Sequence, residues 1–111
     1  MPSGATSVDV VQVTDDRAFH RATLMGRPVD RIVDLINRQH VVGSGTYNCP
    51  NDRGAHDVLT FHGPWPDRRY RLEVEGCGFI DVRVRGKRLS ANFCGGGSVD
   101  HLVTELLSSR R

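Results

Sequence analysis

The sequence predicts an α+β fold: a single curved antiparallel β-sheet with two amphipathic helices packed on it. Three stretches, residues 56–62, 70–74 and 80–84, alternate apolar and polar side chains, as half-buried antiparallel strands do. Two others, residues 29–36 and 99–107, repeat apolar residues with the 3.6-residue period of a helix. A chain of 111 residues is the size of one domain, so we expect both helices to share the sheet.

The N-terminal segment is predicted to form a β-hairpin after a short tail. Residues 1–7 are small and polar and are expected to be disordered, which leaves residues 8–111 as a single α+β domain. The stretch from Ser7 to Thr14 is rich in β-branched residues, and turn-forming residues separate it from a second strand-like stretch, Phe19 to Leu24. We therefore expect these two stretches to pair with each other.

A helix is predicted after Gly26. Pro28 suits its first turn, because the N–H that proline lacks has no helical partner there. The apolar stripe of this helix consists of Val29, Ile32, Val33 and Ile36. Asp34 and Arg38 lie on the other side, four residues apart, which is the spacing of a helical ion pair. The helix is expected to end near residues 40–41.

A meander of three or four antiparallel strands is predicted for the second half of the chain. A short strand over residues 47–49 would precede it and end at Pro50, which cannot donate a backbone hydrogen bond. The alternating stretches follow and are joined by a turn at residues 63–67. A tight turn at residues 85–88 then leads into a last strand over residues 89–93.

The C-terminal helix is expected to begin at Ser98, a natural N-cap that follows three glycines. Its apolar stripe must pack on the sheet and consists of Val99, Leu102, Val103, Leu106 and Leu107. Arg110 and Arg111 follow at the end of the helix, where the helix dipole favours cations.

Charge and hydropathy exclude several classes of function. A formal net charge of +2 is too small to imply a nucleic-acid or membrane partner. The chain has no apolar run long enough for a membrane span. Its first residues lack the basic and apolar regions of a signal peptide. Either the protein is cytosolic, or Met1 was added to a mature chain whose export signal had been removed.

A set of short motifs links residues 28–107 to a known family. The motifs are Val29 to Asn37, Gly45-Thr46-Tyr47-Asn48-Cys49-Pro50 with Asp52, Leu59-Thr60-Phe61, Gly76-Cys77 and Asp100 to Leu107. With them the chain resembles a family of small secreted or lipoprotein-like domains of unknown function from high-GC Gram-positive bacteria. The most specific part is the Gly-Thr-Tyr-x-Cys-Pro element followed by Gly-Cys. The resemblance implies no activity.

The resemblance implies export and a disulfide bond between Cys49 and Cys77. In the loop-entropy model such a bond contributes about 3–4 kcal/mol, a large share of the roughly 5–10 kcal/mol by which a small domain is stable. The alternative is a cytosolic protein in which both thiols are reduced. Cys94 lies outside the family pattern and makes the number of cysteines odd. It is either a small apolar filler or a link that joins two copies in a dimer.

Cys94 is also a candidate nucleophile. It precedes the glycines and the predicted start of a helix, where free backbone N–H groups would lower the pKa of a thiol. His101, or alternatively His62, would then act as its base. No family signature surrounds Cys94. The thiol-dependent enzyme is therefore an alternative, and a noncatalytic protein is preferred.

Two surface features are candidate binding sites. A basic stripe on the solvent face would consist of Arg69, Arg71, Arg83, Arg85, Lys87 and Arg88. Tyr70 lies beside this stripe for stacking, but acidic neighbours such as Glu73 and Asp81 account for the charge without a ligand, so nucleic acid is not favoured. Trp65, between two prolines, would either protrude as an anchor for a partner or fold back as a lid on the core.

No metal ion or cofactor is expected. Spacings typical of zinc ligands are absent, and His56 and His62 on one face of a regular strand would lie about 20 Å apart. The sequence therefore favours a noncatalytic extracytoplasmic domain that is stabilised by a disulfide bond and binds another protein. The thiol-dependent enzyme and a cytosolic accessory protein with reduced cysteines are the alternatives, and the oligomeric state is left open.

Overall fold

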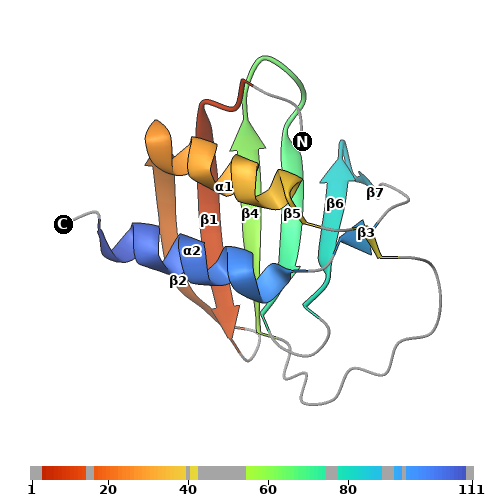
Figure 1. Cartoon of the computed structure of the whole chain (residues 1–111). Helices are drawn as coiled ribbons and strands as arrows, with labels where there is room; N and C mark the ends of the chain where they lie inside the picture. Colours follow the sequence, from red (N-terminus) through yellow and green to blue (C-terminus); the bar gives the residue numbers. More distant parts are fainter. Residues whose placement is uncertain are drawn as a thin grey trace.

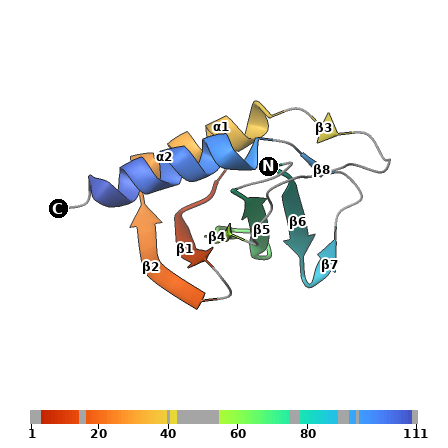
Figure 2. The same ribbon diagram turned by 90° about the horizontal axis from the view of Figure 1, so that it is seen from below.

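The computed structural model describes residues 4–14, 17–39, 41–42, 55–74, 78–88, 92–93 and 95–109. The strands of these residues form one open antiparallel sheet, and both helices lie on the same face of it (Figures 1 and 2). The sheet curves beneath the helices (Figure 2). The predicted α+β class, with a single curved antiparallel sheet and two packed helices, is confirmed.

The N-terminal hairpin forms one side of the sheet. Strand β1 (Ser7–Thr14) pairs antiparallel with β2 (Arg17–Met25), as predicted, and the register shifts between Gln12 and Val13. On its other side β1 pairs antiparallel with β4 (His56–His62). The first strand of the chain is therefore an interior strand of the sheet.

The predicted meander forms the other side of the sheet. Strand β4 pairs with β5 (Arg68–Glu73), and β5 pairs with β6 (Ile80–Val84). The strand order is β2-β1-β4-β5-β6-β8-β3, and β7 also pairs with β6. Three of these strands are only two residues long: β3 (Val41–Val42), β7 (Lys87–Arg88) and β8 (Asn92–Phe93). The short strand expected at residues 47–49 lies outside the described residues.

Helix α1 (Arg27–Asn37) has a proline in its first turn, as predicted. Its buried residues are Val29, Ile32 and Ile36. The helix ends earlier than expected, because its apolar stripe ends and two side chains take up carbonyls of the last turn. Gln39 Nε2 donates to Leu35 O over 2.9 Å, and Arg38 Nε donates to Asp34 O over 3.4 Å. The predicted ion pair forms, with Arg38 Nη2 3.2 Å from Asp34 Oδ2.

Helix α2 (Gly96–Ser108) begins earlier than predicted, and its N-cap is Gly95 in place of Ser98. Gly95 has a φ of 96°, a left-handed conformation that favours glycine. Gly96 lies so close to β5 that an added Cβ would clash with the carbonyl oxygen of Glu73. The glycines therefore do more than separate strand from helix, because they let the first turn of α2 rest directly on the end of β5.

The hydrophobic core lies between the sheet and the two helices. It consists of Val8, Val10, Leu24, Val29, Ile32, Ile36, Leu59, Phe61, Tyr70, Leu72, Ile80, Val82, Val99, Val103 and Leu106. Two polar residues, Gln12 and Asp57, are buried among these apolar side chains. No described helix covers the opposite side of the sheet, which we call the outer face (Figure 2). Within the described residues, neither helix has the length and apolar character needed to cross a membrane.

Candidate binding site on the outer face of the sheet

Arginines gather on the outer face of the sheet over β5 and β6. In the register of these two strands Arg69 lies directly opposite Arg83. Arg85 follows in the turn between β6 and β7, where its φ of 52° and the φ of 76° at Gly86 make two left-handed residues in succession. Tight hairpin turns of type I′ need this conformation at both central residues. Strand alternation puts Arg69 and Arg83 on the outer face, the register of β5 and β6 brings them together, and the turn adds Arg85 at the end of β6.

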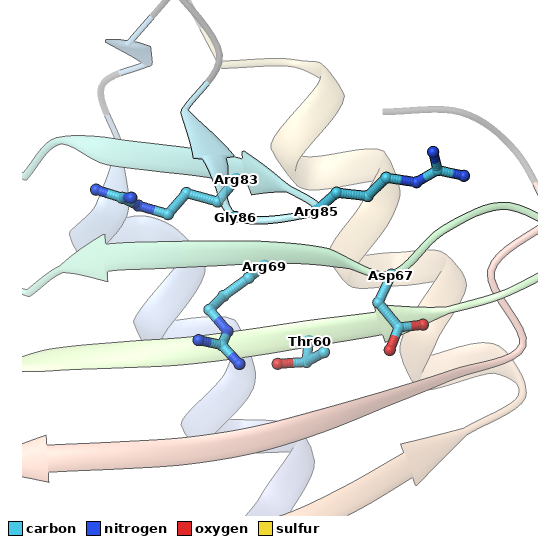
Figure 3. A pocket seen from close by; sticks show the side chains of 6 residues that line it. All are labelled: Thr60, Asp67, Arg69, Arg83, Arg85 and Gly86. Carbon is cyan, nitrogen blue, oxygen red and sulfur yellow. The ribbon is translucent and has the colours of Figure 1, made fainter.

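Two hollows lie over these arginines. The first, of about 340 Å³, is lined by Thr60, Asp67, Arg69, Arg83, Arg85 and Gly86 (Figure 3). The second, of about 510 Å³, is lined by His56, Val58, Arg69, Arg71, Asp81 and Arg83. Because both hollows share Arg69 and Arg83, they adjoin each other on the outer face, and we call the two together the arginine groove. Figure 3 shows Arg69 reaching over β4 beside Thr60, while Arg83 and Arg85 extend in opposite directions.

Acidic side chains neutralise only part of the arginine groove. Asp81 lies 2.7 Å from Arg88 Nε and 3.4 Å from Arg83 Nε. Among the residues that the structure describes, no acidic side chain forms an ion pair with Arg69 or Arg85. Pairing with Asp81, the explanation that needs no ligand, therefore applies to Arg83 within β6 and to Arg88 across from β7. It leaves the charge of Arg69 and Arg85 open to a partner.

His62 lies at the border of this groove, between two carboxylates. Its Nε2 lies 2.7 Å from Asp9 Oδ2 and its Nδ1 lies 2.9 Å from Asp67 Oδ1, so the protonated ring donates a hydrogen bond to each carboxylate. The hydrogen bonds to Asp9 and then to Asp67 raise the pKa of His62, and the bond from His62 lowers the pKa of Asp9. Because both ring nitrogens are engaged, this geometry does not offer His62 as a free base for a thiol.

The structure corrects the expectation for Tyr70 and agrees with one of the two alternatives for Trp65. Tyr70 is only 2% exposed and packs edge-on against Phe61, with ring centroids 5.4 Å apart. It is a core residue and presents no surface for stacking, because strand alternation turns it away from the neighbouring arginines. Trp65 is partly buried against the core, and the guanidinium of Arg68 lies 5.9 Å from its ring centroid. The structure thus places Trp65 as a lid on one end of the core.

The thiol site cannot be built from the described residues. Cys49, Cys77 and Cys94 all lie outside them, so the disulfide bond and the nucleophile stay predictions. His101 is exposed on α2, and its Nε2 lies 3.1 Å from Glu105 Oε1. Within the described ranges, no group of three or more His, Cys, Asp or Glu side chains is placed to hold a metal ion.

Sequence reasoning missed a polar cavity on the helix side of the sheet. This cavity, of about 200 Å³, is lined by Gln12, Val13, Ala55, Asp57, Val74, Asp100 and Thr104. Burial first, and the neighbouring Asp100 second, raise the pKa of Asp57 to about 8. The available signal was that Asp57 shares a strand face with Leu59 and Phe61, an unusual position for a carboxylate.

No protein-family model, curated protein or solved structure matches this chain. The resemblance to small secreted domains therefore stays a prediction. The geometry of the outer face and of the polar cavity is the basis on which a function can be inferred.

Proposed function

We propose that this protein is a noncatalytic binding domain whose arginine groove takes up an acidic segment of another protein. The placement of Arg69 opposite Arg83 carries this proposal. Like charges directly opposite each other destabilise a sheet. Asp81 pairs with Arg83, but among the described residues no acidic side chain pairs with Arg69. A carboxylate bound between the two guanidinium groups would remove that repulsion and form charge-assisted hydrogen bonds.

The shape of the groove favours an extended partner over a small molecule. The side chains of Arg83 and Arg85 diverge, so the groove presents separate cationic groups in place of one convergent pocket (Figure 3). Apolar and small residues, Val58, Thr60 and Gly86, also line the groove and leave room for a peptide backbone. The described lining includes no Phe, Tyr or Trp ring on which a nucleotide base could stack, and its one imidazole, His56, lies 3.4 Å from Arg71 Nη2. An acidic peptide therefore fits this surface better than a single-stranded nucleic acid.

We further propose that the domain works outside the cytoplasm and contains the Cys49–Cys77 disulfide bond. The support for this part is the Gly-Thr-Tyr-x-Cys-Pro and Gly-Cys motifs, through which the chain resembles a family of secreted domains. A binding partner would then be another secreted or envelope protein. An acidic segment of such a partner would stay accessible to the outer face, because no described helix covers it.

Binding of a fluorescent oligoglutamate peptide, followed by fluorescence anisotropy, tests the groove. At low salt, about 50 mM, we expect the wild-type chain to bind the peptide and to release it as ionic strength rises. Arg69→Glu should weaken binding by about tenfold or more, because it removes a charge-assisted contact and adds repulsion. The same variant should unfold at a higher temperature, since the new carboxylate would face Arg83.

The matched control is Arg27→Glu, which changes the net charge equally but lies at the start of α1, away from the groove. We expect it to keep peptide affinity within about twofold of wild type, as a distant charge is largely screened. Equal losses in the two variants would show that net charge alone attracts the peptide and would refute the groove. Tighter binding of a single-stranded oligonucleotide than of the peptide would overturn the assignment to an acidic protein segment.

A further inference from the structure

The polar cavity beneath α2 brings together four side chains that carry oxygen. Gln12 comes from β1, Asp57 from β4, and Asp100 and Thr104 lie one turn apart on α2. We propose that this cavity binds a hard divalent cation, Ca²⁺ or Mg²⁺, between the carboxylates of Asp57 and Asp100. This site lies on the helix side of the sheet and is independent of the arginine groove on the outer face.

Within the described part of the chain, no positively charged side chain lines the cavity beside the carboxylate of Asp57. Asp57 is 2% exposed, and among the described residues nothing donates a hydrogen bond to its Oδ2. Its charged neighbour is Asp100, which is another acceptor, and the described lining of the cavity contains no Arg, Lys or His. A buried carboxylate is stable only when it is neutralised or paired with positive charge. A cation between the two carboxylates would supply that charge to both.

A proton shared between the two carboxyl groups is the rival occupant. It is consistent with the raised pKa of Asp57 at about 8. A shared proton requires no space, however, whereas the carboxyl groups border a cavity of about 200 Å³. A water molecule occupies about 30 Å³ in the liquid, so the cavity has room for an ion with several waters. The volume beside Asp57 therefore favours a hydrated ion over a shared proton.

The donors in the cavity select the class of ion. Carboxylate, hydroxyl and amide oxygens suit hard cations, whereas zinc and copper sites draw on nitrogen or sulfur ligands. At present Gln12 Nε2 donates to Asp100 Oδ1 over 3.4 Å and to Thr104 Oγ1 over 3.2 Å. Rotation of the Gln12 amide would turn its carbonyl oxygen toward an ion instead. Mg²⁺ sites commonly use one or two carboxylates and retain several waters, and Ca²⁺ accepts the same donors in a looser arrangement.

Isothermal titration of the metal-free full chain with CaCl₂ and, separately, MgCl₂ tests this site. The titration is done at about pH 8.5, above the raised pKa of Asp57 at about 8, so that a proton competes less with the ion for this carboxylate. We expect one ion per chain with a Kd of about 0.1–1 mM, typical of weak oxygen sites. Saturation should also raise the thermal unfolding midpoint, because the ion binds only the folded chain. The ion that gives the larger shift identifies which of the two the cavity prefers.

Asp57→Asn is the decisive variant, because asparagine has the shape of the protonated carboxyl group and should preserve the fold. It should bind either ion at least tenfold more weakly, and Asp100→Asn should show the same loss if Asp57→Asn fails to fold. The control is Asp34→Asn, which removes an exposed carboxylate on α1 and should leave ion binding unchanged. Absence of binding and of a midpoint shift in the wild-type chain, or unchanged binding in the folded Asp57→Asn variant, would overturn the proposal.

Discussion

At the scale of single residues, His62 links charge to stability. Its pKa is raised by hydrogen bonds to Asp9 and Asp67, so the folded state favours the protonated ring. This stabilisation is fully present below the ordinary pKa near 6.5 and is lost as pH rises through the higher folded pKa. The effect should be small, because the His62 side chain is 36% exposed and solvent screens the ion pairs.

We therefore expect urea unfolding to show wild type more stable than His62→Gln at about pH 5.5, with the difference shrinking at about pH 8.5. The comparison between the two chains cancels the titration of groups that do not contact His62. A difference that stays constant between the two pH values would mean that His62 contributes packing alone.

Strand alternation predicted which residues share a face but not which of them meet. It placed Arg69 among the outward residues of its strand and Asp57 on the same face as Leu59 and Phe61, and both placements are found. The opposition of Arg69 to Arg83 depends on the register of β5 and β6, and the proximity of Asp57 to Asp100 depends on where α2 crosses the sheet. Such long-range relations leave no local pattern in the sequence.

At the scale of elements, the start of α2 depends on close contact with β5. Gly96→Ala should lower the free energy of unfolding by about 1–3 kcal/mol, because the added methyl group would clash with the backbone oxygen of Glu73. Gly97→Ala is the matched control. Its added Cβ would lie 3.5 Å from Val74 O, an ordinary contact, and alanine is the better helix former by up to about 1 kcal/mol.

Urea or thermal unfolding of the two variants measures both effects, which are expected to have opposite signs. Equal destabilisation would mean that the flexibility of the glycine run matters more than the contact with β5. The position of this helix start was not predictable from the sequence, because Ser98 is the better cap by residue type. The close approach of Gly96 to the sheet, a tertiary contact, decides the start instead.

At the scale of the whole molecule, the sequence predicted the class of the fold but not its strand order. The hairpin and the meander are both found, since each joins neighbours along the chain. The pairing of β1 with β4 joins the hairpin to the meander. These two strands are far apart along the chain, because β2, α1 and β3 lie between them. The pairing and register of two strands so far apart along the chain depend on how their apolar side chains share one core. A short stretch of sequence does not contain that information.

The cysteines lead to a further prediction for the whole molecule. Intact mass spectrometry of natively produced protein, after alkylation of free thiols, should show one label before reduction and three afterwards, with the single label on Cys94. The reason is that a Cys49–Cys77 bond would protect two of the three thiols. Three labels without reduction would refute both the disulfide bond and the extracytoplasmic proposal, while the peptide-binding test of the arginine groove would remain valid.

The interior position of β1 also affects how the chain folds during its synthesis. β1 leaves the ribosome first, yet one of its two neighbours, β4, begins only at His56. Until then the hairpin of β1 and β2 is an isolated two-stranded ribbon, which is marginally stable in water. The sheet can close only when the central strands have emerged, so folding waits for a contact between distant parts of the chain and is slower than in folds built from local contacts. The exposed edge of β1 is a point at which a chaperone or another nascent chain would meet this protein before its own strand arrives.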